Sequence, residues 1–421
     1  MSTRVLSRRE FLRSSAAVTG AAAAAAALPA WMPRLAFAPP GQAVRGDVLI
    51  AIFLRGGADS LNIVVPHGED AYYRARPTLA IPRPDDSSAG ANGRVLDLDG
   101  FFGLHPALAS LLPIFQGGEL LAVHATGSPH DTRSHFEAMD YMERGTPGDY
   151  SLATGWIGRH LATLNTGNTS PLRAVGWGTA LQAALRGASS PVALQSIVDY
   201  HLNGDPAQAA LMSNALNALY SLETGSIYES ALATRAAIDL LAGIDYASYI
   251  PQNGTTYPES EFGMALRQTA ALIRAEVGLE TACIDVGGWD THVNQGGAEG
   301  QQARLLADLA NGLAAFHQDM GVSGVSVVVM SEFGRRLQEN GGGGTDHGHG
   351  GAMLVMGGSV IQTPVVARWN GLNTEALDNG DLAITTDYRD VLAELLTRRL
   401  NNAALADVFP NFTPTPITLF R

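Results

Sequence analysis

Acidic residues and histidines occur together in a few short segments of this sequence. The segment Gly287-Gly288-Trp289-Asp290-Thr291-His292 sets a carboxylate and an imidazole two residues apart. In extended backbone, residues two apart point to the same side, so Asp290 and His292 could reach one cation. A turn with an incidental histidine is the alternative. We interpret the two residues as metal ligands.

A second segment is rich in glycine and reads Gly344-Thr345-Asp346-His347-Gly348-His349-Gly350-Gly351. Glycine permits the close backbone approach and the unusual dihedral angles that a crowded ligand shell needs. Asp346, His347 and His349 are therefore candidate ligands, and a flexible loop that binds nothing is the alternative. A mixture of carboxylate and imidazole ligands suits a divalent metal such as zinc or manganese better than calcium.

Two more acidic residues and one arginine could belong to the same metal site. In Ser331-Glu332-Phe333-Gly334-Arg335, Glu332 could bind a metal and Arg335 could hold a tetrahedral anion through two hydrogen bonds. A salt bridge between a helix and the sheet would explain both residues nearly as well. Asp59 could complete the ligand set, although an aspartate at this position could also simply cap a turn or a helix.

The segment from His130 to Glu137 contains a candidate nucleophile, Ser134. Glu137 follows Ser134 by three residues, which is the pattern of a capping box and would give the hydroxyl a structural role. A helix N-terminus also binds anions, and a hydroxyl beside a metal can lose its proton. Ser134 is thus either a nucleophile or a cap, with His130 or His135 as supporting residues near the metal.

The elements that position these residues alternate between buried strands and amphipathic helices. Apolar runs that are typical of strands cover residues 47–54, 120–124, 282–286, 325–330 and 352–356. Helical periods cover residues 106–115, 134–144, 298–320 and 388–399. This alternation predicts an α/β fold with a parallel or mixed sheet covered on both faces. Ligands of such sheets bind at the carboxyl ends of the strands, where the candidate residues fall.

The alternation is interrupted once. Residues from about 195 to 275 lack buried-strand runs and are rich in alanine and leucine. We interpret this stretch as a helical insertion within a single domain that covers residues 45–421.

The N-terminus has the pattern of an export signal. Ser7-Arg8-Arg9-Glu10-Phe11-Leu12-Arg13 precedes an alanine-rich, mildly apolar stretch, which is typical of the twin-arginine route. A disordered tail or a short membrane anchor is the alternative. We predict that residues 1–38 are a signal peptide and its flank, that the twin-arginine translocase is a partner during export, and that the mature protein is periplasmic or secreted.

Composition excludes several classes of function. All 27 basic residues are arginine, so neither a Schiff-base lysine nor the lysine of a P-loop is available. The formal net charge of -13 argues against nucleic acid or an anionic membrane as a partner. No run after residue 38 approaches the roughly 18 apolar residues of a spanning helix, so we expect no stable membrane span in the mature form. Cys283 is the single cysteine, which rules out an intramolecular disulfide.

Taken together, these motifs resemble the bacterial domain-of-unknown-function family numbered fifteen hundred and one. The resemblance extends in order from about residue 47 to residue 399. The matching segments are the twin-arginine leader, Leu54-Arg55-Gly56-Gly57-Ala58-Asp59-Ser60-Leu61-Asn62, Val65-Pro66, Ser134-His135-Phe136, Gly288-Trp289-Asp290-Thr291-His292, Ser331-Glu332-Phe333-Gly334-Arg335, Asp346-His347 and Thr386-Asp387-Tyr388-Arg389.

That family looks related to the alkaline phosphatase and sulfatase superfamily, which implies a three-layer sandwich around a mostly parallel, metal-bearing sheet. The residues that match the superfamily's site by order and setting are Asp59, Ser134, Asp290, His292, Asp346 and His347. The sequence departs from the superfamily in the close spacing of Asp290 and His292. It also departs in the long connection that separates Glu332 from Asp346-His347. The sulfatase cysteine motif is absent, which excludes formylglycine chemistry.

The resemblance and the motifs lead to one leading hypothesis and one rival. The leading hypothesis is an exported metal-dependent hydrolase of phosphate esters, with sulfate esters less favoured, acting on a small anionic ester. Ser134 or a metal-bound water would attack, and the metal would be held by Asp59, Asp290, His292, Asp346, His347 and, in addition, Glu332 or His349. The rival is an exported binding or scaffold protein with the same fold and a vestigial metal site.

Overall fold

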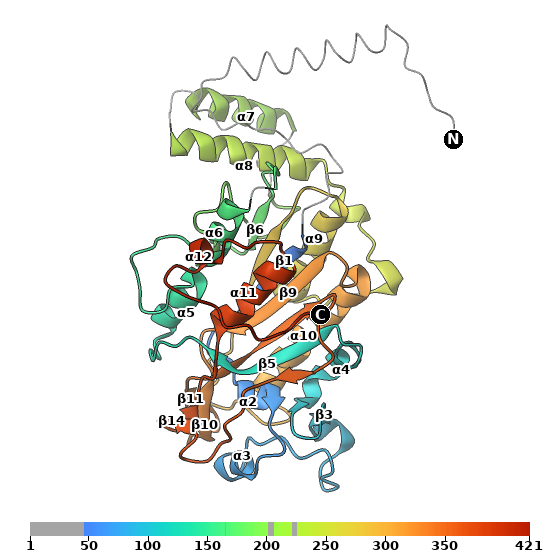
Figure 1. Cartoon of the computed structure of the whole chain (residues 1–421). Helices are drawn as coiled ribbons and strands as arrows, with labels where there is room; N and C mark the ends of the chain where they lie inside the picture. Colours follow the sequence, from blue (N-terminus) through green and yellow to red (C-terminus); the bar gives the residue numbers. More distant parts are fainter. Residues whose placement is uncertain (1–45, 165, 201–205, 221–224) are drawn as a thin grey trace, which may run out of the picture.

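The apolar runs of the sequence form the middle of one large sheet, which organises the molecule (Figure 1). The computed structural model describes residues 46–164, 166–200, 206–220 and 225–421, so the predicted signal peptide lies outside the described residues. The strands of the large sheet are β1 (Val48–Leu54), β5 (Leu120–Gly127), β6 (Ala174–Trp177), β7 (Val192–Leu194), β8 (Thr281–Val286), β9 (Val325–Ser331), β12 (Gly351–Gly357), β13 (Val365–Val366) and β16 (Thr386–Asp387).

This nine-stranded sheet is mixed but mostly parallel. Its order is β13-β5-β12-β9-β1-β8-β6-β7, and β16 also pairs with β5. Strand β1 lies in the centre and pairs in parallel with β8 on one side and β9 on the other. Strand β12 runs antiparallel to both of its neighbours, β5 and β9. The expected α/β class with a mixed, mostly parallel sheet is confirmed.

Helices pack on both faces because the strand side chains alternate between the two faces. In β1, Ile50 and Ile52 belong to one buried cluster, whereas Leu49 and Phe53 belong to a second cluster on the other face. Helices α9 (Glu261–Arg274) and α10 (Gln301–Met320) cover the first face. Helices α5 (His135–Arg144), α6 (Trp156–Thr163), α11 (Tyr388–Arg398) and α12 (Leu405–Val408) contribute to the second cluster.

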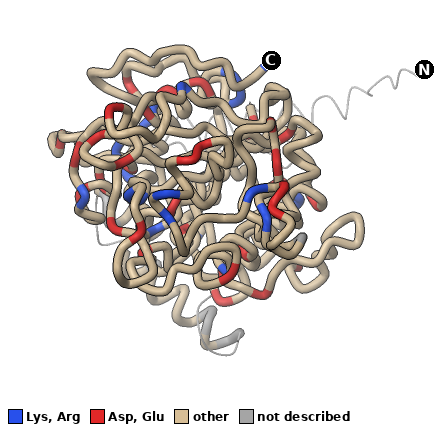
Figure 2. Tube along the Cα trace, turned by 90° about the horizontal axis from the view of Figure 1, so that it is seen from below, with Lys and Arg blue, Asp and Glu red and all other residues tan. Residues whose placement is uncertain are grey.

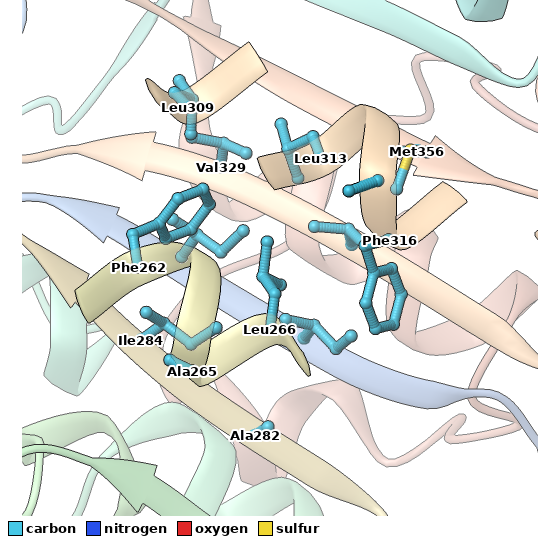
Figure 3. Close-up of a cluster of buried hydrophobic side chains, with 14 of the residues drawn as sticks. Phe262, Ala265, Leu266, Ala282, Ile284, Leu309, Leu313, Phe316, Val329 and Met356 are labelled. Atoms are coloured by element: carbon cyan, nitrogen blue, oxygen red, sulfur yellow. The ribbon is translucent and has the colours of Figure 1, made fainter. Parts of the chain in front are cut away.

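The packing of α9 and α10 on the sheet is visible in Figure 3. Phe262 and Leu266 of α9 and Leu313 of α10 point toward the strands between the two helices. Ile284 of β8 and Val329 of β9 meet them from the sheet. Burial of this apolar surface at about 25 cal/mol per Å² is what holds the helical layer on the sheet.

Two smaller sheets complete the end of the molecule at which β1 finishes (Figure 1). A three-stranded sheet contains β2 (Val64–Val65), β3 (Leu96–Asp97) and β4 (Gly103–Leu104), and a four-stranded sheet contains β10 (Arg335–Glu339), β11 (Thr345–His347), β14 (Leu377–Asp378) and β15 (Asp381–Leu382). The remaining elements are α2 (Ser60–Ile63), α3 (Asp70–Ala75), α4 (Leu112–Gln116), η1 (Ala91–Gly93), η2 (Pro106–Leu111), η3 (Ala183–Leu185), η4 (Tyr246–Ser248) and η5 (Gln252–Gly254).

The predicted helix over residues 106–115 is divided in the structure. Its first part, η2, is a 3-10 helix, and an α-helix, α4, begins only at Leu112. Pro113 lies in the first turn of α4, where its missing N–H costs nothing. One continuous α-helix would place Pro113 in the interior, where its ring clashes with the preceding turn.

The stretch from 195 to 275 is helical where it is described, but only part of it stands apart from the sheet. Helices α7 (Pro206–Tyr220) and α8 (Ser226–Ala242) lie beyond the upper end of the sheet (Figure 1). Helix α9, in contrast, belongs to the layer that covers the sheet. Within the part of the chain that the structure describes, no helix combines the length and apolar character that a bilayer crossing requires.

Candidate metal centre

The carboxyl ends of the three central strands lie side by side and carry the candidate residues. Because β8, β1 and β9 are parallel neighbours, the segments that follow them leave the sheet at one edge. Asp290 and His292 follow β8, and Glu332 follows β9. The antiparallel pair β10 and β11 then brings His347 opposite Arg335 at the same edge. Helix α5, which starts at His135 after β5, supplies one more side chain.

A glycine after β1 allows these segments to approach closely. Gly56 has a φ of +125°, and a Cβ atom at this position would lie 2.5 Å from the backbone nitrogen of Asp290. No other residue type fits both the dihedral angle and the space. The glycine pair after the first strand therefore serves the close packing of the Asp290 segment.

Three histidines of this edge each direct Nδ1 at an oxygen atom. The Nδ1 of His135 lies 2.7 Å from Oε1 of Glu332, and the Nδ1 of His292 lies 3.0 Å from Oδ1 of Asp346. The Nδ1 of His347 lies 2.9 Å from the backbone oxygen of Arg133. Carbonyl and ionised carboxylate oxygens only accept hydrogen bonds. Each Nδ1 therefore carries the hydrogen and donates it, which leaves a lone pair on each Nε2 of a neutral imidazole.

The three Nε2 atoms converge on one carboxylate oxygen. Oδ1 of Asp290 lies 3.0 Å from Nε2 of His292, 3.4 Å from Nε2 of His347 and 3.5 Å from Nε2 of His135. The Nε2 atoms of His292 and His347 are 2.8 Å apart. Lone pairs and a negative oxygen at these distances repel one another unless a proton or a cation lies among them.

The geometry of the four atoms fits a tetrahedral cation. Ligand bonds of about 2.0 to 2.1 Å at a tetrahedral zinc ion separate the ligand atoms by roughly 3.3 Å. Four of the six separations, from 2.8 Å to 3.5 Å, bracket that value, and the ligand atoms of His135, Asp290 and His347 all lie within 4.8 Å of one another. The Nε2 of His135 is buried and has no hydrogen-bond partner among the described residues, as expected of an atom reserved for a ligand. The donor set therefore fits a divalent metal.

The charges around the cluster keep its acids ionised. Burial alone would raise the pKa of Asp290, but the hydrogen bond and positive charge of Arg335 hold it below its ordinary value. Hydrogen bonds from Asn340 and His292 lower the pKa of Asp346. Burial lowers the pKa of His347, and the neighbouring His135 adds to this effect, which favours the neutral, ligating form.

Glu332 acts on the cluster through His135. Its side chain is buried, accepts a hydrogen bond from the backbone N–H of Gly56 at 2.8 Å, and accepts the Nδ1–H of His135. Burial would raise the pKa of Glu332, but these hydrogen bonds keep it below its ordinary value. The hydrogen bond to Glu332 in turn raises the pKa of His135. We had considered Glu332 as a ligand; its contacts instead orient a ligand and fix its tautomer.

The structure gives Arg335 a different role from the anion clamp that we had considered. Its side chain is fully buried, and its nitrogen atoms donate to the backbone oxygens of Gly56, Gly57, Trp289 and Thr345 and to Oδ1 of Asp290 at 2.6 Å. Because the side chain is fully enclosed, it offers no exposed donor to a bound ester. Arg335 joins the loops after β1 and β8 and orients Asp290.

Two further residues of the predicted ligand set have other partners. Both carboxylate oxygens of Asp59 accept hydrogen bonds from Arg76, at 2.6 Å and 2.9 Å, and Gln295 donates to one of them. The ion pair is completely buried, so Asp59 anchors α3 to the sheet. The Nδ1 of His349 lies 2.8 Å from Asp378, outside the cluster of histidines. Neither residue contributes to the convergence on Asp290.

Ser134 occupies the N-cap position of α5 but makes no side-chain capping bond to any described residue. Thr132, not Ser134, donates a hydrogen bond to Glu137, at 2.8 Å. The predicted capping box is therefore wrong in its hydrogen bonds. Ser134 is exposed, and its two neighbours contact the cluster: Arg133 through its backbone oxygen and His135 through its ring.

An open cavity of about 440 Å³ adjoins the cluster. The residues that line it are Arg133, His292, Arg336, Asp346, His347, Asn379 and Asp381. Figure 2 shows this end of the molecule from below, where basic positions lie beside acidic ones along the chain. His292 and His347 are among the residues that line this open cavity, so their side chains can be reached from solvent.

His135 is the member of the His/Asp cluster that the sequence motifs do not predict as a ligand. From the sequence it is expected only to be a supporting residue near the metal, because the segment around it is dominated by the candidate nucleophile Ser134. A signal was present, since the Ser-His-Phe motif belongs to the segments that carry the family resemblance.

The fold and site define an α/β protein with a His/Asp cluster at the carboxyl edge of a mixed sheet. Comparison with known families agrees with the resemblance in the sequence. The chain belongs to the family described as Protein of unknown function (DUF1501), whose model matches residues 47–398.

Comparisons with individual proteins are much weaker. No curated protein matches the chain. The crystal structure of Ps i-CgsB is 10% identical, with 87% of this chain and 74% of that chain covered and a TM-score of 0.35. The same protein in complex with k-i-k-neocarrahexaose gives 10% identity, 84% and 71% coverage and a TM-score of 0.31.

Proposed function

We propose that this protein is an exported, divalent-metal-dependent hydrolase of small phosphate esters, with an alkaline phosphatase-like arrangement of its three layers. Sulfate esters are a less favoured substrate class. The single observation that carries the proposal is the convergence of three imidazole lone pairs on one oxygen of Asp290 beside an open cavity.

The proposed ligands are His135, Asp290, His292 and His347, with zinc favoured over manganese because four nitrogen and oxygen ligands suit tetrahedral coordination. When bound, such a cation would neutralise charge on an ester and lower the pKa of a neighbouring hydroxyl. Asp346 and Glu332 hold two of the imidazoles in the tautomer that presents Nε2. Arg335 keeps Asp290 ionised and fixed in position.

Ser134 is the proposed attacking group. Its hydroxyl is exposed and free of a capping bond to the described residues, and it lies between the two residues that contact the cluster. Its position at the start of a ten-residue helix also favours a negative charge on its oxygen or on a bound ester. Water is the rival nucleophile.

Metal content is the first test. The protein, exported by its own leader and purified without chelators, should hold at least one zinc or manganese ion per chain by elemental analysis. His135→Ala and His347→Ala should lose it, whereas the matched change His317→Ala should not, because His317 pairs with Glu119 away from the cluster. A wild-type protein without bound metal that also fails to bind added zinc would refute the proposal.

Catalysis is the second test. The metal-loaded protein should hydrolyse p-nitrophenyl phosphate faster than p-nitrophenyl sulfate, and the His135→Ala variant should not. The rival function is an exported binding protein whose metal site has no catalytic use. The burial of Arg335 favours this rival, because it leaves the cluster without the anion clamp expected from the sequence. Bound metal without hydrolysis of either ester would support that rival.

A further inference from the structure

Two arginines form the wall of the cavity that faces the His/Asp cluster, and no role has been assigned to them. Arg133 and Arg336 both line the cavity, together with His292 and His347. The side chain of Arg133 is 35% exposed and that of Arg336 is 46% exposed, so part of each guanidinium reaches solvent. This distinguishes them from the fully buried Arg335.

A single carboxylate holds both guanidinium groups in place. Asp381 is buried, with 1% of its side chain exposed. One of its oxygens accepts hydrogen bonds from Nε and Nη2 of Arg133, and the other lies 3.3 Å from Nε of Arg336. Two positive groups thus share one negative group, Asp381, and the cavity lining as a whole sets Arg133 and Arg336 against the two carboxylates of Asp346 and Asp381.

The backbone connects this wall to the cluster. The carbonyl oxygen of Arg133 accepts the Nδ1–H of His347, so the residue that offers its guanidinium to the cavity also orients a ligand. Arg336 follows Arg335 in β10 and pairs with Asp381 across to β15. Arg336 is therefore positioned by a pair of strands, and Arg133 by its hydrogen bonds to Asp381 and by the bond between its backbone and His347, as a built anion site requires.

We infer that Arg133 and Arg336 form an oxyanion subsite that selects dianionic phosphate monoesters over monoanionic phosphate diesters and sulfate esters. This inference rests on the proposed function. A phosphate monoester carries nearly two negative charges at neutral pH. The cluster takes the oxygen that faces it, and the two guanidinium groups take the outer oxygens, for which planar donors are well suited. A diester or sulfate ester offers one charge fewer to the same wall.

The test measures equilibrium binding of inorganic phosphate to the metal-loaded full chain by calorimetry, before any assay of activity. Arg133→Gln and Arg336→Gln should each weaken phosphate binding about tenfold, since each variant replaces a charged hydrogen-bond donor to the anion by a neutral one. Arg336→Lys should recover part of the loss because it keeps the charge. Arg83→Gln is the matched control: Arg83 is also 35% exposed and paired with an aspartate, Asp70.

Kinetics then test the selectivity. In both glutamine variants, kcat/KM for p-nitrophenyl phosphate should fall about tenfold, whereas kcat/KM for bis(p-nitrophenyl) phosphate should change less than threefold. Unchanged phosphate affinity in both variants, with metal still bound, would overturn the subsite and leave the proposed hydrolase intact. Absence of metal from the wild type would overturn the proposed function, on which the subsite rests. A purely structural role for the arginines predicts lower stability with normal phosphate affinity.

Discussion

Replacing Glu332 by Gln removes a charge from the hydrogen-bond network of the cluster while it preserves the shape of the side chain. In the wild type, Oε1 of Glu332 accepts the Nδ1–H of His135 at 2.7 Å and the N–H of Gly56 at 2.8 Å. An amide oxygen can accept the same two bonds. The new amide group would face the hydroxyl of Ser331, which already donates to the backbone oxygen of Leu54 and can accept.

The expected magnitude follows from the change in the His135 hydrogen bond. A bond to a charged partner contributes about 1.5 to 3 kcal/mol and a neutral one about 0.5 to 1.5 kcal/mol, so the variant should lose about 1.4 kcal/mol. That energy corresponds to a tenfold weaker metal affinity, at the lower end of the 10- to 100-fold loss typical of residues that support metal-bound histidines. His135→Ala, which removes the ligand itself, should lose far more.

A competition titration of zinc against a chelating indicator measures this difference directly. Thermal unfolding at a fixed excess of zinc gives a second readout, because tenfold weaker binding reduces the ligand-induced stabilisation by about 1.4 kcal/mol. Glu280→Gln is the control, since Glu280 is also buried and ion-paired, with Arg173, but lies outside the cluster. An affinity within twofold of the wild type would refute the reasoning, and so would a loss as complete as that of His135→Ala.

Two other substitutions test roles assigned above, and a third tests the effect of burying His160 in α6. Ser134→Ala should change the free energy of unfolding by less than about 0.5 kcal/mol, because no capping bond to a described residue is lost, and should lower esterase turnover by several orders of magnitude; normal turnover would transfer the attack to water. Asp59→Asn should destabilise the fold by about 3 to 5 kcal/mol in urea titrations, through the buried partner Arg76, with metal content unchanged; loss of metal would make Asp59 a ligand. Burial lowers the pKa of His160 to about 4, so the unfolded chain binds more protons between pH 4 and 6.5, and stability should fall as the pH falls through that range; His160→Gln should flatten this part of the profile, and an unaltered slope would contradict the assignment.

The central strands were predictable from sequence because their burial on both faces demands unbroken apolar runs. Runs such as 47–54 and 325–330 correspond to β1 and β9 almost residue for residue. Strands β6 and β7 were missed, since four and three residues give no periodicity to recognise and Gly176 interrupts the first. Their place in the sheet depends on pairing with distant strands, which no local pattern encodes.

The location of the candidate site was more predictable from the sequence than the identity of the residues that form it. Strand ends correctly brought Asp290, His292 and His347 to one edge of the sheet. The positions of Asp59 and Glu332 after strands were also correct, but position alone does not reveal which partner a carboxylate meets. Asp59 is neutralised by Arg76, which lies 17 positions later at the end of a short helix. The packing of that helix cannot be predicted from the local sequence.

The segments that meet at Asp290 come from widely separated parts of the chain: His135 and Glu332 are 197 positions apart, and Asp290 and His347 are 57 apart. A nascent chain therefore cannot assemble this His/Asp cluster until nearly all of the sheet has formed, because no local segment supplies more than two of its side chains. A bound ion would link three loops, and its release would require those loops to separate. Metal exchange should then be slow and governed by local opening of this edge, not by diffusion of the ion.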